Sequence, residues 1–255
     1  MMLTMARMHA WERALIGAAL MLLTLLAWAY LVLHGTPSDM ATPMAMPGEV
    51  GWGLEMLAMS ALMWTVMMVA MMLTSAGPMI LTYARVHHNK AANGLASVPT
   101  WLFVAGYLAV WTGVAFLLAL AQWGLHQSEL LGSAMGRVSP LLGGGLLITA
   151  GAFQFSRLKA ACLGKCRSPL GFLMTEWREG HAGALVMGIR HGLFCTGCCW
   201  ALMLLMFVGG VMSLAWMAAM ALYYLLEKCL PRATQLSRLT GALLIVAGAV
   251  VMLMQ

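Results

Sequence analysis

Residues 54–83 read LEMLAMSALMWTVMMVAMMLTSAGPMILTY, and this stretch decides the fold class. It is predominantly apolar and longer than the roughly 20 residues that a helix needs to cross the hydrocarbon core of a membrane. Its methionines include a series at intervals of four, and that spacing places them along one face of a helix: Met59, Met63, Met67 and Met71. The stretch therefore predicts a transmembrane helix with a face of thioether groups.

The composition of the whole chain extends this prediction. Of 255 residues, 62% are hydrophobic and 9% are charged, with a mean hydropathy of +0.88. Such a chain cannot supply the polar surface of a soluble globule. We expect one all-α integral membrane domain over residues 1–255, a polytopic bundle of about seven transmembrane helices. They are residues 13–33, 54–83, 100–123, 139–156, 185–208, 211–227 and 236–254.

The fifth and sixth of these helices are separated only by Gly209 and Gly210. They could instead form one kinked element or a re-entrant hairpin. The basic residues favour two separate spans. With the N-terminus in the cytoplasm and the C-terminus outside, thirteen of the fourteen Lys and Arg residues fall on the inner side, and only Arg137 lies outside.

This asymmetry predicts a multi-pass protein of the bacterial inner (cytoplasmic) membrane, in which residues 157–184 form a cytoplasmic segment that contains cysteines. It also explains the net charge of +6. Nucleic-acid readers carry a basic face on a soluble module, so we expect membrane lipid and no nucleic acid among the partners.

All six cysteines fall at or near the cytoplasmic face in this topology, where thiols stay reduced. Cys162 and Cys166 are four residues apart, which brings both thiols to one face of a helix. Basic residues surround them and favour the deprotonated form that binds metals, namely Lys159, Lys165 and Arg167. The pair therefore indicates metal binding or thiol redox chemistry.

A second cluster lies in HGLFCTGCCW, residues 191–200. On a helical wheel His191, Cys195 and Cys198 fall within about 60° of one another, and Cys199 lies at the edge of that arc. Met203 and Met206 follow on the next turns. Thiolate and thioether ligands together select copper(I); a Cys and His set would also suit zinc, but thioethers contribute little to zinc sites. The cluster predicts a copper(I) site.

Two explanations stay open for the methionines of residues 54–83. Met63, Met67 and Met71 could form a low-affinity copper relay toward the outer side. They could equally be core residues, because methionine is a flexible apolar residue that fills gaps between helices.

We interpret some other polar and small residues as structural. We expect Glu227 to pair with Arg190 or Lys228, and Gly143 to Gly145 to allow close helix packing. The sequence contains no G-x-S-x-G, no Gly-rich phosphate loop and no H-E-x-x-H, so we expect a protein that is not an enzyme.

Four segments together resemble a bacterial family of metal-binding integral membrane proteins, named for a membrane copper chaperone of tyrosinase-type enzymes. The segments are FQFSRLKAACLGKCRSPL at 153–170, HGLFCTGCCWALM at 191–203, FVGGVM at 207–212 and MMVAMML at 67–73. The resemblance implies copper handling by six residues: Cys162, Cys166, His191, Cys195, Cys198 and Cys199. The chain departs from the family pattern at Thr74, where a helix-kinking proline is expected.

The sequence thus predicts a copper(I)-binding membrane protein that acts as a copper chaperone or relay to an apo-cuproenzyme. One alternative is a transporter of copper or another metal, whose marks would be acidic residues or broken helices within the membrane. Another is a membrane thiol-disulfide oxidoreductase that exchanges electrons through the cysteines. We find neither the marks of a transporter nor a thioredoxin-like unit in the sequence.

Overall fold

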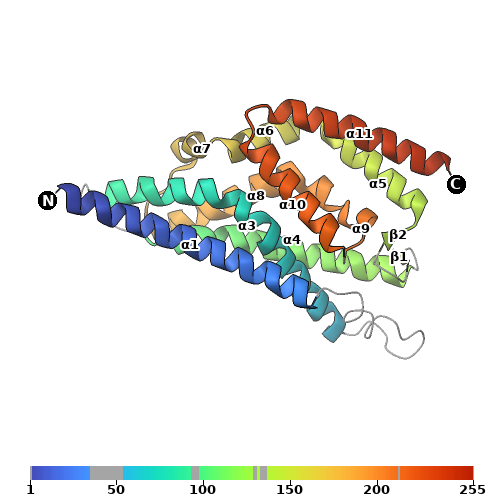
Figure 1. Ribbon diagram of the computed structural model, residues 1–255, viewed down its shortest axis with the longest axis horizontal. Helices are drawn as coiled ribbons and strands as arrows, with labels where there is room; N and C mark the ends of the chain where they lie inside the picture. The colour runs from blue at the N-terminus through green and yellow to red at the C-terminus, as the bar shows by residue number, and fades with distance from the viewer. Residues whose placement is uncertain are drawn as a thin grey trace.

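The computed structural model describes residues 2–34, 54–92, 98–128, 131–132, 137–211 and 213–254, with side chains for all of these except 2–10, 12, 89–92 and 131–132. Almost all of the described chain is helical (Figure 1). One antiparallel pair of two-residue strands, β1 (Leu131–Gly132) and β2 (Arg137–Val138), precedes α5. The helices are α1 (Met2–His34), α3 (Leu54–Ala92), α4 (Thr100–Gln127), α5 (Pro140–Phe153), α6 (Arg157–Arg167), α7 (Pro169–Glu176), α8 (Gly180–Met203), α9 (Met206–Gly209), α10 (Leu214–Cys229) and α11 (Ala233–Leu253).

The length and composition of these helices confirm an all-α polytopic membrane bundle. Within the described residues, five helices are long and apolar enough to span a membrane: Arg13–His34, Leu54–His88, Thr100–Gln127, Gly180–Gly209 and Ala233–Leu253. The bent pair of α5 and α6 makes a sixth if both helices belong to one span. The count of seven stays a prediction, because α10 has only 16 residues.

The longest helix, α3, contains Pro78 and changes direction part-way along its length (Figure 1). Proline lacks the N–H that would bond to the carbonyl of Thr74, and its ring crowds that carbonyl. Pro78 therefore supplies the kink that the resemblance led us to expect from a proline at position 74. Near the same point, the Ser75 hydroxyl donates to the carbonyl of Met72 at 2.9 Å.

Glycines let α4 and α8 touch through their backbones. A Cβ atom added at Gly188 would lie 2.0 Å from the carbonyl oxygen of Phe103, and one at Gly106 would lie 2.3 Å from that of Leu185. Small residues at helix contacts allow this close approach in membrane proteins. The contact fixes the position of α8, which carries four of the predicted ligands: His191, Cys195, Cys198 and Cys199.

A second pair of helices, α5 and α11, packs in the same way and lies side by side at one edge of the bundle (Figure 1). A Cβ atom at Gly144 would lie 3.0 Å from the carbonyl of Gly248, and one at Gly151 would lie 2.7 Å from that of Gly241. The close packing expected around Gly143 to Gly145 is thus provided by Gly144, whereas Gly145 has nothing within 4 Å of its Cβ position.

The chain bends by 66° between α5 and α6. The Ser156 side chain caps α6 by accepting a hydrogen bond from the Lys159 N–H at 3.1 Å. The transmembrane span over residues 139–156 stays a prediction; α5 ends at Phe153, and the bend follows at the end of that range. The bend turns α6 out of line with α5 and packs it against α8, so that Cys162 and Cys166 are buried.

The expected break at Gly209 and Gly210 is present. Gly210 has a φ of 98°, a conformation that favours glycine, and the Ser213 side chain caps the start of α10. The Trp216 ring packs against Gly209, where a Cβ atom would lie 2.4 Å from it, and its Nε1 donates to the Leu205 carbonyl at 2.9 Å. The chain reverses here, and α10 runs back toward α6 (Figure 1).

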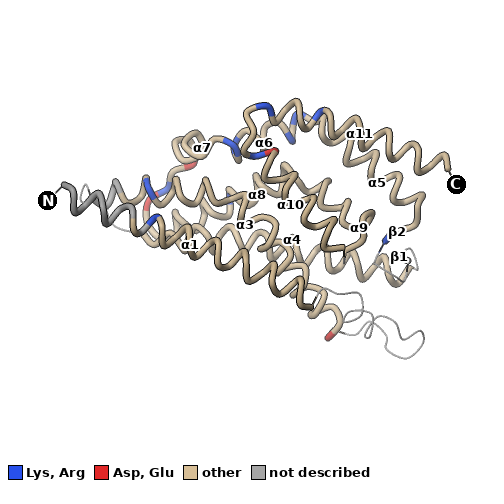
Figure 2. Tube along the Cα trace, in the orientation of Figure 1, with Lys and Arg blue, Asp and Glu red and all other residues tan. Residues whose placement is uncertain are grey.

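Basic residues gather at one end of the described bundle, around α6, α7 and the start of α11, whereas Arg137 on β2 lies at the other end (Figure 2). This separation is the one that a positive-inside arrangement requires. Which end faces the cytoplasm stays a prediction.

Candidate metal centre

The packing of α6 against α8 brings the two cysteine motifs together. The Cys166 thiol lies close enough to the thiols of Cys195 and Cys198 to interact with both. Cys162 is adjacent to this group, because its sulfur would lie 2.8 Å from a Cβ atom at Gly197 on α8. Gly197 therefore provides the space into which the Cys162 thiol fits.

Three thiols on α8 share one buried turn. The Sγ atoms of Cys198 and Cys199 both donate to the carbonyl oxygen of Cys195 at 3.0 Å, and all three residues are at most 1% exposed. The helical wheel predicted this grouping, since residues three and four positions apart lie on one face. With Cys166 added from α6, four thiols form what we call the thiol cluster: Cys166, Cys195, Cys198 and Cys199.

Cys195 lies at the centre of the polar contacts in this cluster. The Lys228 ammonium donates to its sulfur at 3.0 Å, and the Tyr107 hydroxyl lies 3.3 Å from the same atom. Lys228 also donates to the Ser75 hydroxyl at 2.7 Å, and Tyr107 donates to the carbonyl of Met72 at 3.1 Å. Helices α3, α4 and α10 thus all contribute polar groups around one thiol.

Sequence reasoning missed these neighbours of Cys195. Lys228 was assigned to the positive inner segment, and Tyr107 and Ser75 carried no pattern that would single them out. Cys195 and Cys198 also form a C-x-x-C pair inside α8, a spacing known from thiol redox sites. A lysine in the last turn of an apolar helix was the one available signal for a charge at the cluster.

His191 is buried one turn before Cys195, with 2% of its surface exposed. Its ring stacks on Phe103 and Tyr107, with centroid distances of 6.0 and 5.5 Å, and meets Phe172 edge-on at 5.4 Å. Among the described residues its Nδ1 atom has no hydrogen-bond partner. An imidazole nitrogen held in this way has spare capacity to bind a metal.

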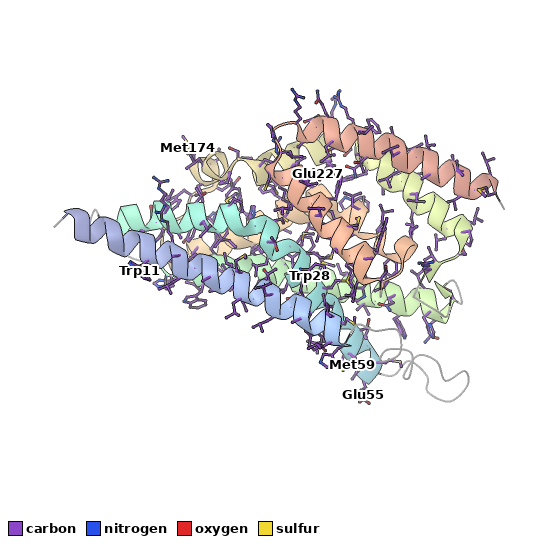
Figure 3. The ribbon with its side chains drawn as sticks, viewed as in Figure 1. Trp11, Trp28, Glu55, Met59, Met174 and Glu227 are labelled. Atoms are coloured by element: carbon purple, nitrogen blue, oxygen red, sulfur yellow. The ribbon has the colours of Figure 1, made fainter. Side chains whose placement is uncertain are left out.

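The methionines of α3 divide into exposed and buried positions. Met59 is 60% exposed at the end of the bundle that also holds Glu55 (Figure 3), while Met63 is 9% and Met67 and Met71 are 1% exposed. The last three belong to the hydrophobic core, as do Met203 and Met206 of the α8 and α9 region. Their burial is compatible with packing, and a role in copper binding stays a prediction.

The expected partners of Glu227 are wrong. Glu227 pairs with Lys159 of α6 at 2.7 Å, with both side chains 1% exposed. Arg190 pairs instead with Glu176 of α7. The error arose because residues at the same membrane level need not face one another, and the bend before α6 brings Lys159 to Glu227.

The six cysteines are all free thiols, and only Cys229 is exposed. In the part of the chain that the structure describes, no three His, Cys, Asp or Glu side chains already surround a common point as metal ligands would. The thiols of the cluster instead make other hydrogen bonds: Cys198 and Cys199 donate to the Cys195 carbonyl, and the Cys195 sulfur accepts from Lys228. Their soft sulfur donors fit copper(I), which accepts two or three ligands, once those hydrogen bonds are exchanged for metal bonds.

The sequence that builds this arrangement matches a known protein family. A family model described as PpoB2, a copper chaperone, matches residues 61–251. The chain belongs to this family. The match covers all of the thiol cluster, together with Cys162, His191 and Lys228, and it confirms the resemblance that the cysteine motifs indicated.

The PpoB2 description names a carrier of copper rather than a catalyst. Comparisons with curated proteins and with solved structures give no match.

Proposed function

We propose that this PpoB2 family member binds copper(I) at the thiol cluster and delivers it to an apo-cuproenzyme. Cys166 and Cys195 would hold the ion between α6 and α8, and Cys198 and Cys199 would supply further sulfurs. Cys162 and His191 lie at the edge of the cluster, where they could accept or release the ion during transfer. The copper is cargo in this proposal and not a permanent cofactor.

The single observation that carries the proposal is the meeting of two cysteine motifs from distant helices in one buried position. The Cys166 thiol lies close enough to Cys195 and Cys198 to interact with both, although some thirty residues separate them in sequence. A buried thiol is common in membrane helices, but four thiols that converge with a lysine at hydrogen-bonding distance require another explanation. Soft metal binding is the chemistry that thiolates favour.

Delivery requires that copper(I) also leaves the site. Copper(I) tolerates two or three ligands, so a recipient thiol or imidazole can bind before the last protein sulfur departs. The cluster has more sulfurs than a two-coordinate ion needs, which allows the ion to exchange one ligand at a time. Without copper, the thiols of Cys198 and Cys199 are held by hydrogen bonds to the Cys195 carbonyl, and the packing of α6 against α8 keeps Cys166 beside them.

The test uses the full-length protein, purified in detergent under reducing conditions. Copper bound per protein is measured in competition with a chromophoric copper(I) chelator, for the parent, Cys195→Ser/Cys198→Ser and Cys229→Ser. We expect the parent and Cys229→Ser to retain copper, because Cys229 lies outside the cluster. The double variant should lose it, since serine keeps nearly the same volume without the soft donor.

Two outcomes would count against the proposal. A double variant that retains as much copper as the parent would make the cluster structural. A copper-loaded parent that fails to activate apo-tyrosinase, used as a probe recipient, while free copper(I) at the same concentration succeeds, would support binding without delivery.

The C-x-x-C pair of Cys195 and Cys198 favours a second candidate, a membrane thiol-disulfide oxidoreductase. In that case the isolated protein should cycle between a dithiol and a disulfide at these positions, with one thiolate attacking a partner disulfide. Mass spectrometry after mild oxidation would detect the Cys195 to Cys198 bond. Reversible formation of this bond without copper retention would favour the oxidoreductase over the chaperone.

A further inference from the structure

Lys228 has an unusual place for a charged residue in this bundle. It lies in the last turn of α10, and its ammonium group reaches between α3 and α8 to Ser75 and Cys195. Among the described residues no carboxylate lies within ion-pair distance of it, and the neighbouring Glu227 is already paired with Lys159. The sulfur of Cys195 is therefore the group that can supply a negative charge to Lys228.

A positive charge fixed beside a metal site repels the metal in proportion to the charge of the ion. For the same set of thiolates, the repulsion of a divalent ion is twice that of a monovalent ion. The four thiols are buried and Lys228 is part-buried, so the medium between the ammonium and the site weakens this difference less than bulk water would.

The type of ligand alone does not discriminate copper(I) from zinc(II). Four cysteines, or three cysteines with a histidine, also form common zinc sites. A site that handles copper(I) therefore needs a further feature that disfavours zinc. Two thiolates with one copper(I) carry a net charge of −1, which Lys228 neutralises, whereas the same thiolates with zinc and Lys228 leave a charge of +1 inside the bundle.

We propose that Lys228 is the residue that makes the thiol cluster specific for a monovalent soft ion over divalent ions. The inference rests on the proposed copper(I) function of the same cluster. Ser75 fixes the ammonium group in place, and Lys228 acts through its charge without binding the metal itself.

The experiment compares Lys228→Met, Lys228→Gln and Lys228→Arg with the parent, all full-length and reduced. Dissociation constants for copper(I) and zinc(II) are each measured by competition with a chromophoric chelator, and their ratio is the readout. We expect the preference for copper(I) to fall at least about tenfold in the two neutral variants, and to persist in Lys228→Arg. Arg157→Met is the matched control, because Arg157 also loses a positive charge but is exposed at the start of α6.

Each outcome has a definite meaning. An unchanged ratio in a folded neutral variant that still binds copper would overturn the inference and leave the proposed function intact. Lys228→Gln covers the case in which Lys228→Met does not fold, since glutamine keeps a hydrogen-bond donor for Ser75 and Cys195. A loss of preference in Lys228→Arg equal to that in Lys228→Gln would show that shape and not charge is responsible. A parent that binds neither ion would remove the proposed function and this inference together.

Discussion

The Lys159 ammonium lies 2.7 Å from the Glu227 carboxylate, and this buried ion pair joins α6 to α10. The hydroxyls of Tyr223 and Ser237 donate to the same carboxylate oxygen at 2.9 and 2.6 Å, so α11 is joined as well. Lys159 stands one turn before Cys162 on α6. The pair therefore determines where α6 places its two thiols.

Removing the charge of Glu227 should destabilise the protein and disturb the cluster. Glu227→Gln leaves Lys159 buried without its counter-charge, which costs about 3–5 kcal/mol of unfolding free energy. We expect a lower unfolding temperature and weaker copper(I) retention, both measured in detergent. Glu176→Gln is the control: its partner Arg190 is 44% exposed, and such a pair is worth about 0–1 kcal/mol. Equal stability of the two variants would contradict the role given to the buried pair.

Gly197 should control the position of the Cys162 thiol. In Gly197→Ala the new Cβ would lie 2.8 Å from the Cys162 sulfur, so the thiol must rotate away from α8. We expect the variant to stay folded and to exchange copper(I) with a soluble chelator several-fold more slowly, as measured by stopped-flow absorbance. In Gly164→Ala, on the same helix as Cys162, nothing lies within 4 Å of the new atom, and the exchange rate should match the parent. An unchanged rate in Gly197→Ala would remove Cys162 from the transfer path.

The methionines of α3 can be tested with nearly isosteric changes. Met63→Leu/Met67→Leu keeps the apolar volume of two buried side chains and removes their thioethers, so stability should change by less than about 1.5 kcal/mol. If these thioethers form a relay, the tight site stays occupied and only exchange with copper from the opposite side slows. Met59→Leu, at an exposed position, serves as the control. Exchange at the parental rate in the double variant would identify these methionines as packing residues.

The sequence was sufficient to predict the features that depend on helix periodicity. The grouping of Cys195, Cys198 and Cys199 follows from the helical repeat, and the break at Gly210 follows from the freedom of glycine at positive φ. The fold class follows from apolar runs such as residues 54–83. Each of these depends on residues close together in the chain.

The features that sequence reasoning missed depend on contacts between distant helices. Tyr107 is 88 positions from Cys195, and Lys228 is 33 positions from it, so no local pattern links them. Gln154 to Ser156 interrupt the apolar run before α6, and Ser156 was a readable capping signal, but the bend angle depends on how α6 packs against α8. The same bend explains why Glu227 meets Lys159.

The orientation in the membrane can be tested by labelling single cysteines in a Cys229→Ser background, which removes the exposed native thiol. Met174→Cys on α7, 85% exposed at the basic end, should react only from the cytoplasmic side (Figures 2 and 3). Ser128→Cys, exposed after the last turn of α4, should react with an impermeant reagent added to whole cells. The reverse pattern would place the basic end outside and make disulfide chemistry the better explanation of the cysteines.

The central claim is that α6 and α8 share one copper(I) site, and X-ray absorption at the copper edge tests it most directly. The copper-loaded, reduced parent should show two or three sulfur neighbours around copper(I), because thiolates are the softest donors in the cluster. Because the three thiols of α8 can replace a lost sulfur, Cys166→Ser is judged by its affinity: it should bind copper(I) more weakly than the parent in competition with a chelator, and Cys229→Ser should bind it equally well. A parent with only nitrogen and oxygen neighbours, or parental affinity in Cys166→Ser, would contradict a site shared between the two helices.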